Sequence, residues 1–222
     1  LATLDDLDLR TGGDVAVEAR NRSSLRSDLS GSVSTLDDTL PFLGGIAVNS
    51  LIANNTILSQ LGATITDTDL VARGALSVTA GNSAAIEASN TASARGSLAS
   101  VGVLLAHNTI GWDMPSLSRQ SKDTLVGKYG AQDARPLERK ALAVARISGS
   151  TLDVGGDVDL QAAMAATLQA AIDNSVASAS SGASTGLVIS TNSVSSAATA
   201  ELLDARSSTS GVLGQAKVAG SL

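Results

Sequence analysis

His107 is the only histidine in the chain and the first residue to consider for catalysis. A Ser-His-Asp arrangement needs the imidazole beside an exposed serine and a carboxylate, but serine is so common in this chain that nearness to one has no weight. In two similar segments the position of His107 holds Asn54 and Thr191. We therefore interpret His107 as a replaceable polar residue near a strand end, and we predict no catalytic residue and no enzyme activity.

Aspartates recur at turns and raise the question of a metal. Asp14 and Asp157 each follow two glycines, and the pairs Asp67–Asp69 and Asp37–Asp38 lie close in sequence. Calcium would be the natural ion, because it binds several carboxylate and carbonyl oxygens. The Gly-Gly-x-Gly-x-Asp repeat of calcium-binding β-helices is absent, however. The pattern favours aspartates that stabilise turns, with calcium as the alternative, and we predict no metal and no cofactor.

Asparagine recurs at one place in a second pattern. Asn55, Asn108 and Asn192 each end an apolar stretch and precede Thr or Ser and then a β-branched residue. If those stretches stack, the three amides can bond to one another as a ladder. The alternative is three turn residues that face solvent.

Aromatic and basic residues gather in one segment, residues 111–140. Two of the three aromatic residues and several cations lie there, in a chain whose net charge is -6. We predict that this segment is a loop that contacts another copy of the protein, because interfaces favour buried aromatic anchors and complementary charges. The residues that we expect to make this contact are Trp112, Met114, Arg119, Lys128 and Tyr129. A self-packed loop or a small-ligand site are the alternatives.

The elements that carry these residues repeat along the chain. A glycine turn followed by alternating apolar residues occurs at residues 12–17, 73–78 and 155–160, with a degraded copy at 214–218. Alternation with period 2 is typical of a strand with one buried face. We predict that one stacked position holds Val15, Val17, Leu76, Val78, Val158 and Leu160 with their side chains pointing inward.

Unequal spacing between the copies locates two insertions. The apolar position at Val15 recurs at Leu76, at Val158 and, in our alignment, at Ala216, and the interval from Leu76 to Val158 is clearly the longest. This long interval places an insertion of about 30 residues at 111–140, and a smaller one lies near 35–42. We predict strand for the Ala-rich run at 161–171, with helix as the alternative, and a helix over 133–146.

Composition limits the remaining choices. Ala, Ser and Thr make up about two-fifths of the chain and aromatic residues 1%, so any core must be thin. No basic cluster could follow a phosphate backbone, and no apolar run approaches a membrane span, so we predict neither a nucleic-acid partner nor a membrane span. Cysteine is absent, which excludes disulfides and thiolate chemistry. The chain begins and ends within the pattern, so we expect a segment of a longer protein.

The glycine and asparagine motifs resemble the repeat regions of giant bacterial exoproteins, the leukotoxin-type filamentous adhesins and haemagglutinin-like proteins. Residues 12–17 and 155–160 and the motifs at Asn55, Asn108 and Asn192 carry this resemblance, which covers most of the chain outside 111–140. It implies a β-solenoid on the cell surface or in a secreted fibre, and it transfers no catalytic residue.

Together these observations predict an all-β chain, a single β-solenoid over residues 1–222. We expect repeats of about 60 residues at 7–64, 65–146 and 147–203, with a partial copy at 204–222. The expected function is that of a secreted or cell-surface structural module that associates with itself in a filament or adhesin. The alternatives are a β-helix whose loops grip a surface glycan or host ligand, and, less favoured by the lack of aromatic residues, a polysaccharide-processing enzyme.

Overall fold

A computed structural model describes residues 1–35, 45–96, 98–113, 137–178, 183–207 and 216–221. Its regular structure consists of β-strands, and no helix occurs among the described residues. The prediction of an all-β chain is confirmed. The Ala-rich run at 161–171 lies within a strand, as we expected.

Parallel strands form four sheets, numbered here in the order in which the chain first enters them. Sheet 1 contains β1 (Ala2–Asp5), β5 (Gln60–Thr66), β11 (Ala141–Ser148) and β15 (Ser196–Leu203). Sheet 2 contains β2 (Asp8–Thr11), β6 (Asp69–Ala72), β12 (Thr151–Val154) and β16 (Arg206–Ser207). Sheet 3 contains β3 (Val15–Thr35), β7 (Leu76–Gly96), β13 (Val158–Ser178) and β17 (Ala216–Ser221). Sheet 4 contains β4 (Ile46–Ile57), β8 (Ala99–Ile110) and β14 (Ser184–Val194).

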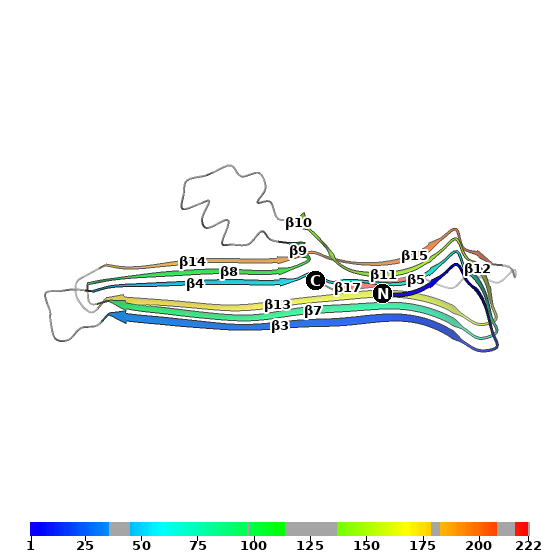
Figure 1. Cartoon of the computed structure of the whole chain (residues 1–222), viewed down its shortest axis with the longest axis horizontal. Helices are drawn as coiled ribbons and strands as arrows, with labels where there is room; N and C mark the ends of the chain where they lie inside the picture. Colours follow the sequence, from blue (N-terminus) through cyan, green and yellow to red (C-terminus); the bar gives the residue numbers. More distant parts are fainter. Residues whose placement is uncertain (36–44, 97, 114–136, 179–182, 208–215, 222) are drawn as a thin grey trace.

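The chain passes through the sheets in a fixed order and then returns to the first, one strand further along the stack. Ala2 pairs with Ala63 and Val15 with Leu76, so equivalent residues of the first two passes keep the same sequence separation in sheets 1 and 3. In the elongated body of Figure 1, sheet 3 forms one long face. Sheets 4 and 1 lie end to end on the opposite face, and sheet 2 closes one end. This arrangement is compatible with a β-solenoid.

Small and branched apolar side chains fill the interior. Val17, Leu76, Val78 and Leu160 are buried, and Val15 and Val158 are partly buried against the same core. All six predicted inward residues therefore point inward. Their register also matches the prediction, because Leu76 pairs with both Val15 and Val158.

A left-handed backbone conformation recurs at the corner between sheets 1 and 2. Asp6, Asp67 and Asp204 have φ angles of 51°, 46° and 49°, and Gly149 has 60°. The sheet 1 register places these four residues in one column. Asp tolerates this region better than most residues, and Gly enters it without strain. The corner is therefore built by the same turn in each pass.

The other corner, between sheets 2 and 3, contains the glycine motif. The amide of Gly156 donates to the carbonyl of Gly74 at 2.9 Å, and that of Gly74 to the carbonyl of Gly13 at 3.2 Å. A Cβ on Gly156 would lie 3.0 Å from the carbonyl carbon of Gly74. Such close stacking of turns favours glycine at Gly74 and Gly156, each of which packs against the turn of the previous pass.

Two details of the sequence interpretation are wrong. Residues 137–146 are not helical: Leu137–Glu138 forms β10, and the residues from Ala141 onward belong to β11. Ala and Leu favour helices in isolation, but pairing with β5 and β15 decides the structure here. In the last copy, Ala216 pairs with Leu160 and not with Val158, so our alignment was out of register there.

Candidate functional site

The large insertion follows the end of β8 and precedes the start of β11. Gly111, with a φ of +76°, turns the chain away from the stack, and its amide donates to the carbonyl of Ile57 at 2.9 Å. Beyond it, β9 (Trp112–Asp113) pairs with β10 (Leu137–Glu138) in an antiparallel ladder. The insertion thus leaves and re-enters the stack through a short two-stranded base.

Polar contacts join the two sides of this base to each other and to the stack. The hydroxyl of Ser195 donates to a carboxylate oxygen of Glu138 at 2.6 Å. Asp113 and Arg139 form an exposed ion pair at 3.5 Å. The hydroxyl of Thr109 donates to the carbonyl of Trp112 at 3.2 Å.

Trp112 is the one predicted contact residue whose position is described. It is partly buried, and its indole nitrogen has no hydrogen-bond partner among the described residues. Met114, Arg119, Lys128 and Tyr129 lie outside the described residues, so the contact with another copy stays a prediction.

The asparagine ladder is confirmed. The side-chain amide of Asn55 donates to the oxygen of Asn108 at 2.8 Å, and that of Asn108 donates to Asn192 at 2.9 Å. Asn108 is fully buried, Asn55 is nearly so, and Asn192 lies exposed on the last strand of sheet 4. A one-residue slip of the central strand would break both bonds, so the ladder helps to fix the register of sheet 4.

His107 lies on β8 with Asn54 and Thr191 as its partners in register, which confirms the equivalence predicted from the motif. Partial burial lowers its pKa from the ordinary value of 6.5. Its Nδ1 atom has no hydrogen-bond partner among the described residues. The three strands of sheet 4 contain no Asp, Glu, Lys or Arg.

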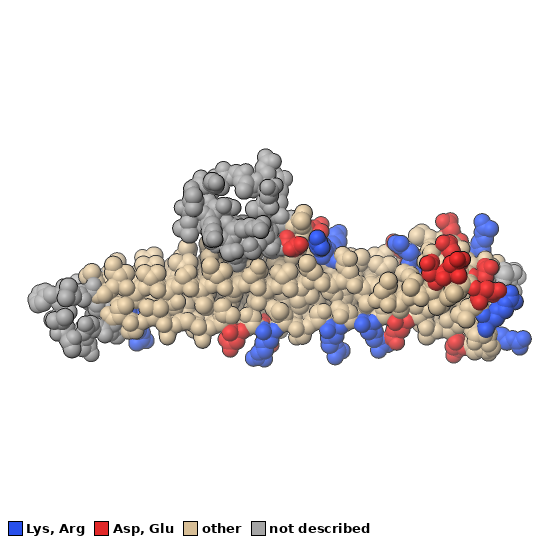
Figure 2. Space-filling model, in the orientation of Figure 1, with Lys and Arg blue, Asp and Glu red and all other residues tan. Residues whose placement is uncertain are grey.

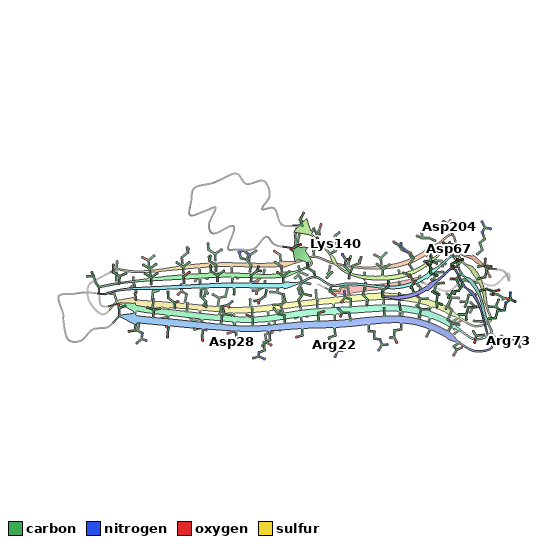
Figure 3. The ribbon with its side chains drawn as sticks, in the orientation of Figure 1. Arg22, Asp28, Asp67, Arg73, Lys140 and Asp204 are labelled. Atoms are coloured by element: carbon green, nitrogen blue, oxygen red, sulfur yellow. The ribbon has the colours of Figure 1, made fainter. Side chains whose placement is uncertain are left out.

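Aspartates at the corners accept hydrogen bonds from the backbone or occupy its left-handed turns. A carboxylate oxygen of Asp14 accepts a hydrogen bond from the amide of Ala75, one pass further along, at 2.8 Å. Figure 3 shows Asp67 and Asp204 close together at the corner between sheets 1 and 2, where two of the left-handed turns lie. The described residues contain no group of three or more Asp, Glu or His that could hold a metal ion. Asp37 and Asp38 lie outside the described residues.

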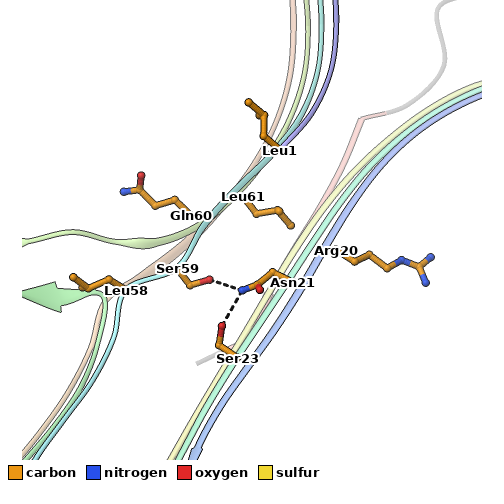
Figure 4. A pocket seen from close by; sticks show the side chains of 8 residues that line it. All are labelled: Leu1, Arg20, Asn21, Ser23, Leu58, Ser59, Gln60 and Leu61. Carbon is orange, nitrogen blue, oxygen red and sulfur yellow. Dashed lines mark hydrogen bonds between the residues drawn. The ribbon is translucent and has the colours of Figure 1, made fainter.

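A pocket of about 420 Å³ opens beside the first strands of the stack (Figure 4). Asn21 of β3 donates to the hydroxyls of Ser59 and Ser23, at 2.8 and 3.0 Å, and to the oxygen of the buried Asn82 at 3.0 Å. The other residues that line the pocket are Leu1, Arg20, Leu58, Gln60 and Leu61. The pocket lies beside the first strands, where the interior of the stack opens to solvent. Its lining residues include no cluster of reactive groups.

Comparison with known proteins identifies no relative: no family model, no curated protein and no solved structure matches the chain. With no helix among its described residues, the structure offers no helical segment that could cross a membrane.

Sequence reasoning missed two features of sheet 4 and its surroundings. One is the buried Asn82–Ser59–Asn21 network, which joins sheet 3 to the link between β4 and β5. The other is the outward side of sheet 4, which carries large apolar side chains. The absence of charge over residues 46–57 and 99–110 was a signal for the second feature.

Proposed function

We propose that the chain is a structural, non-catalytic segment of a β-solenoid in a secreted or cell-surface filament or giant adhesin. The observation that carries this proposal is the in-register parallel stacking of four sheets, each of which has at the start of the stack a strand edge with no partner among the described residues. Such edges bind further strands readily, and repeat proteins either cap them or use them for assembly.

The longest of these edges belongs to β3, which has 21 residues. Val15 donates its amide to the carbonyl of Ala75 at 2.8 Å, so its backbone groups point toward β7. Because backbone groups alternate in direction along a strand, odd-numbered residues of β3 face β7 and even-numbered residues face the open edge. The side chains of even residues such as Arg22 and Asp28 also point outward from β3 (Figure 3).

A pair of proline substitutions tests whether this edge is used. Arg22→Pro removes an edge-facing amide and should leave the fold intact, since edge strands tolerate proline. Ser23→Pro, the matched control, removes an amide that faces β7 and should destabilise the chain by about 3 kcal/mol. Negative-stain microscopy should show rods longer than one chain for the unchanged protein and rods only one chain long for Arg22→Pro. Single rods for the unchanged protein at every concentration would refute stacking through this edge.

The insertion provides a second and separable test. Replacing residues 114–136 with a short Gly-Ser link keeps the β9–β10 base and removes Met114, Arg119, Lys128 and Tyr129. We expect the circular dichroism spectrum to be unchanged and the assembly to weaken. Identical polymers from the trimmed protein would show that the insertion has another role.

A further inference from the structure

The outward side of sheet 4 is unusual for a solvent-facing surface. Strands alternate so that buried Leu104 and Ala106 of β8 separate residues whose side chains point outward. The outward residues include large apolar side chains on all three strands, with Val48 exposed to 58%, Leu187 to 48% and Ile189 to 45%. The apolar outer face is defined here by Val48, Ile52, Val103, Leu105, Leu187 and Ile189.

Charge is absent from this face and concentrated elsewhere. The strands β4, β8 and β14 include no Asp, Glu, Lys or Arg. Figure 2 shows the charged side chains along the sheet 3 side and at the end closed by sheet 2, with few on the remaining body. Soluble monomers rarely expose a contiguous apolar patch of this kind unless it binds something.

We propose that the apolar outer face binds the same face of a second copy of this chain, giving a lateral, two-fold pair of stacks. Both surfaces are then uncharged, so a protein of net charge -6 can pair there without bringing like charges together. Two sheets with the same twist also pack well face to face, as in a β-sandwich. A lipid surface fits less well, because membrane-facing surfaces usually carry Lys or Arg beside the apolar residues.

The whole outer side of sheet 4, which contains the apolar outer face and the polar residues beside it, is large enough for such a pair. Strands of 12 residues at about 3.3 Å each, in a sheet of three strands about 4.8 Å apart, give a footprint of roughly 550 Å² per copy. Two copies together would cover about 1,100 Å², which reaches the lower limit of about 1,000 Å² for specific interfaces. An antiparallel two-fold arrangement places the two β9–β10 ladders at opposite ends of the interface, where they do not collide.

Val103, near the centre of the face, is the position at which we test the proposal. Because the chain has no cysteine, a single Cys substitution introduces the only thiol. Facing sheets lie about 10 Å apart, too far for a disulfide, so a short bismaleimide is the suitable cross-linker. We expect Val103→Cys to cross-link to twice the monomer mass of 22.1 kDa and Ala85→Cys, at an outward position of β7, to remain monomeric.

Charge variants give a readout that does not depend on cross-linking. Val103→Lys and Val103→Glu should each lose the dimer in sedimentation at concentrations where the unchanged chain is dimeric, and an equimolar mixture should regain it. Ala85→Lys is the matched control. The measurements are repeated in the Arg22→Pro background, so that stacking through the β3 edge and lateral pairing are scored separately.

Three outcomes would overturn the proposal. One is a thiol at position 103 that does not react in the monomer, which would mean that another part of the chain covers the face. Another is binding of zwitterionic vesicles without any dimer, which would make lipid the occupant. The last is sedimentation that is the same for Val103→Lys and the unchanged chain.

Discussion

Replacing asparagine with leucine at two buried positions should change stability in opposite directions. Asn108, in the ladder of sheet 4, uses both its amide and its oxygen. Asn90 of β7 is equally buried, at 1% exposed, yet neither polar atom of its side chain has a partner among the described residues. Leucine has nearly the same shape as asparagine, so the comparison isolates the hydrogen bonds.

The magnitudes follow from the contacts of each residue. Asn108→Leu removes two hydrogen bonds and leaves the buried amide of Asn55 unpaired, which together should cost about 2–4 kcal/mol. Asn90→Leu removes a polar group that was already unpaired, and its register partners Leu29 and Ile172 are apolar. We therefore expect a gain of about 1–3 kcal/mol.

Urea unfolding followed by circular dichroism near 218 nm measures both effects. Asn192→Leu, at the exposed end of the same ladder, is the control and should cost no more than about 1 kcal/mol. The reasoning is refuted if Asn108→Leu and Asn90→Leu shift stability in the same direction. It also fails if the control costs as much as the central substitution.

Three further predictions concern a turn, a titration and a fragment. Gly149→Val should lose about 1–3 kcal/mol in urea unfolding, because a β-branched residue is strained at a φ of 60°, whereas Gly149→Asn should lose less; equal losses would contradict this. Burial lowers the pKa of His107, so the unfolded chain binds its proton more tightly and stability should fall as the pH drops below about 6.5. The urea midpoint should therefore decrease between about pH 7.5 and about pH 5.5, and His107→Asn should flatten the change; an equal slope in both would exclude His107 as the cause. Residues 61–110 alone leave both edges of every strand unpaired and should be unfolded or aggregated by circular dichroism, and a cooperative melt would count against the stacked architecture.

The register of sheets 3 and 4 could be predicted because short motifs mark it at each pass. The glycine turn places Val15, Leu76 and Val158 in one column, and the asparagine motif does the same for sheet 4. Prediction failed where no motif recurs. We predicted a helix over 133–146, with Pro136 near its first turn, but pairing with β5 and β15 makes β11 a strand.

The corner turns were only partly visible in the sequence. Asp6, Asp67 and Asp204 share a column with Gly149, but the Asp-x-Asp-Leu pattern that begins at Asp6 and Asp67 does not continue at Gly149 and Asp204. Their common property is a left-handed backbone, which Asp and Gly both accept. The sequence interpretation therefore included Asp67 among the turn aspartates, but it did not include Asp6 or Asp204 and did not show that the three build the same corner.

The orientation of sheet 4 follows from the ladder and explains why large side chains face outward. Ordinary alternation would place Val48 and Ile52 inside, because they are among the larger apolar residues of β4. Once Asn55 points inward to bond Asn108, the period of two forces Ala47 and Ala53 inward as well, and both are buried. Small residues on this side suit a flat interior, since the inward positions of β7 hold several alanines as well. The same phase sends the six residues of the apolar outer face to the outside, while Leu104 of β8 points inward. The ladder that fixes the register therefore also sets the orientation of the surface through which we propose that two stacks pair.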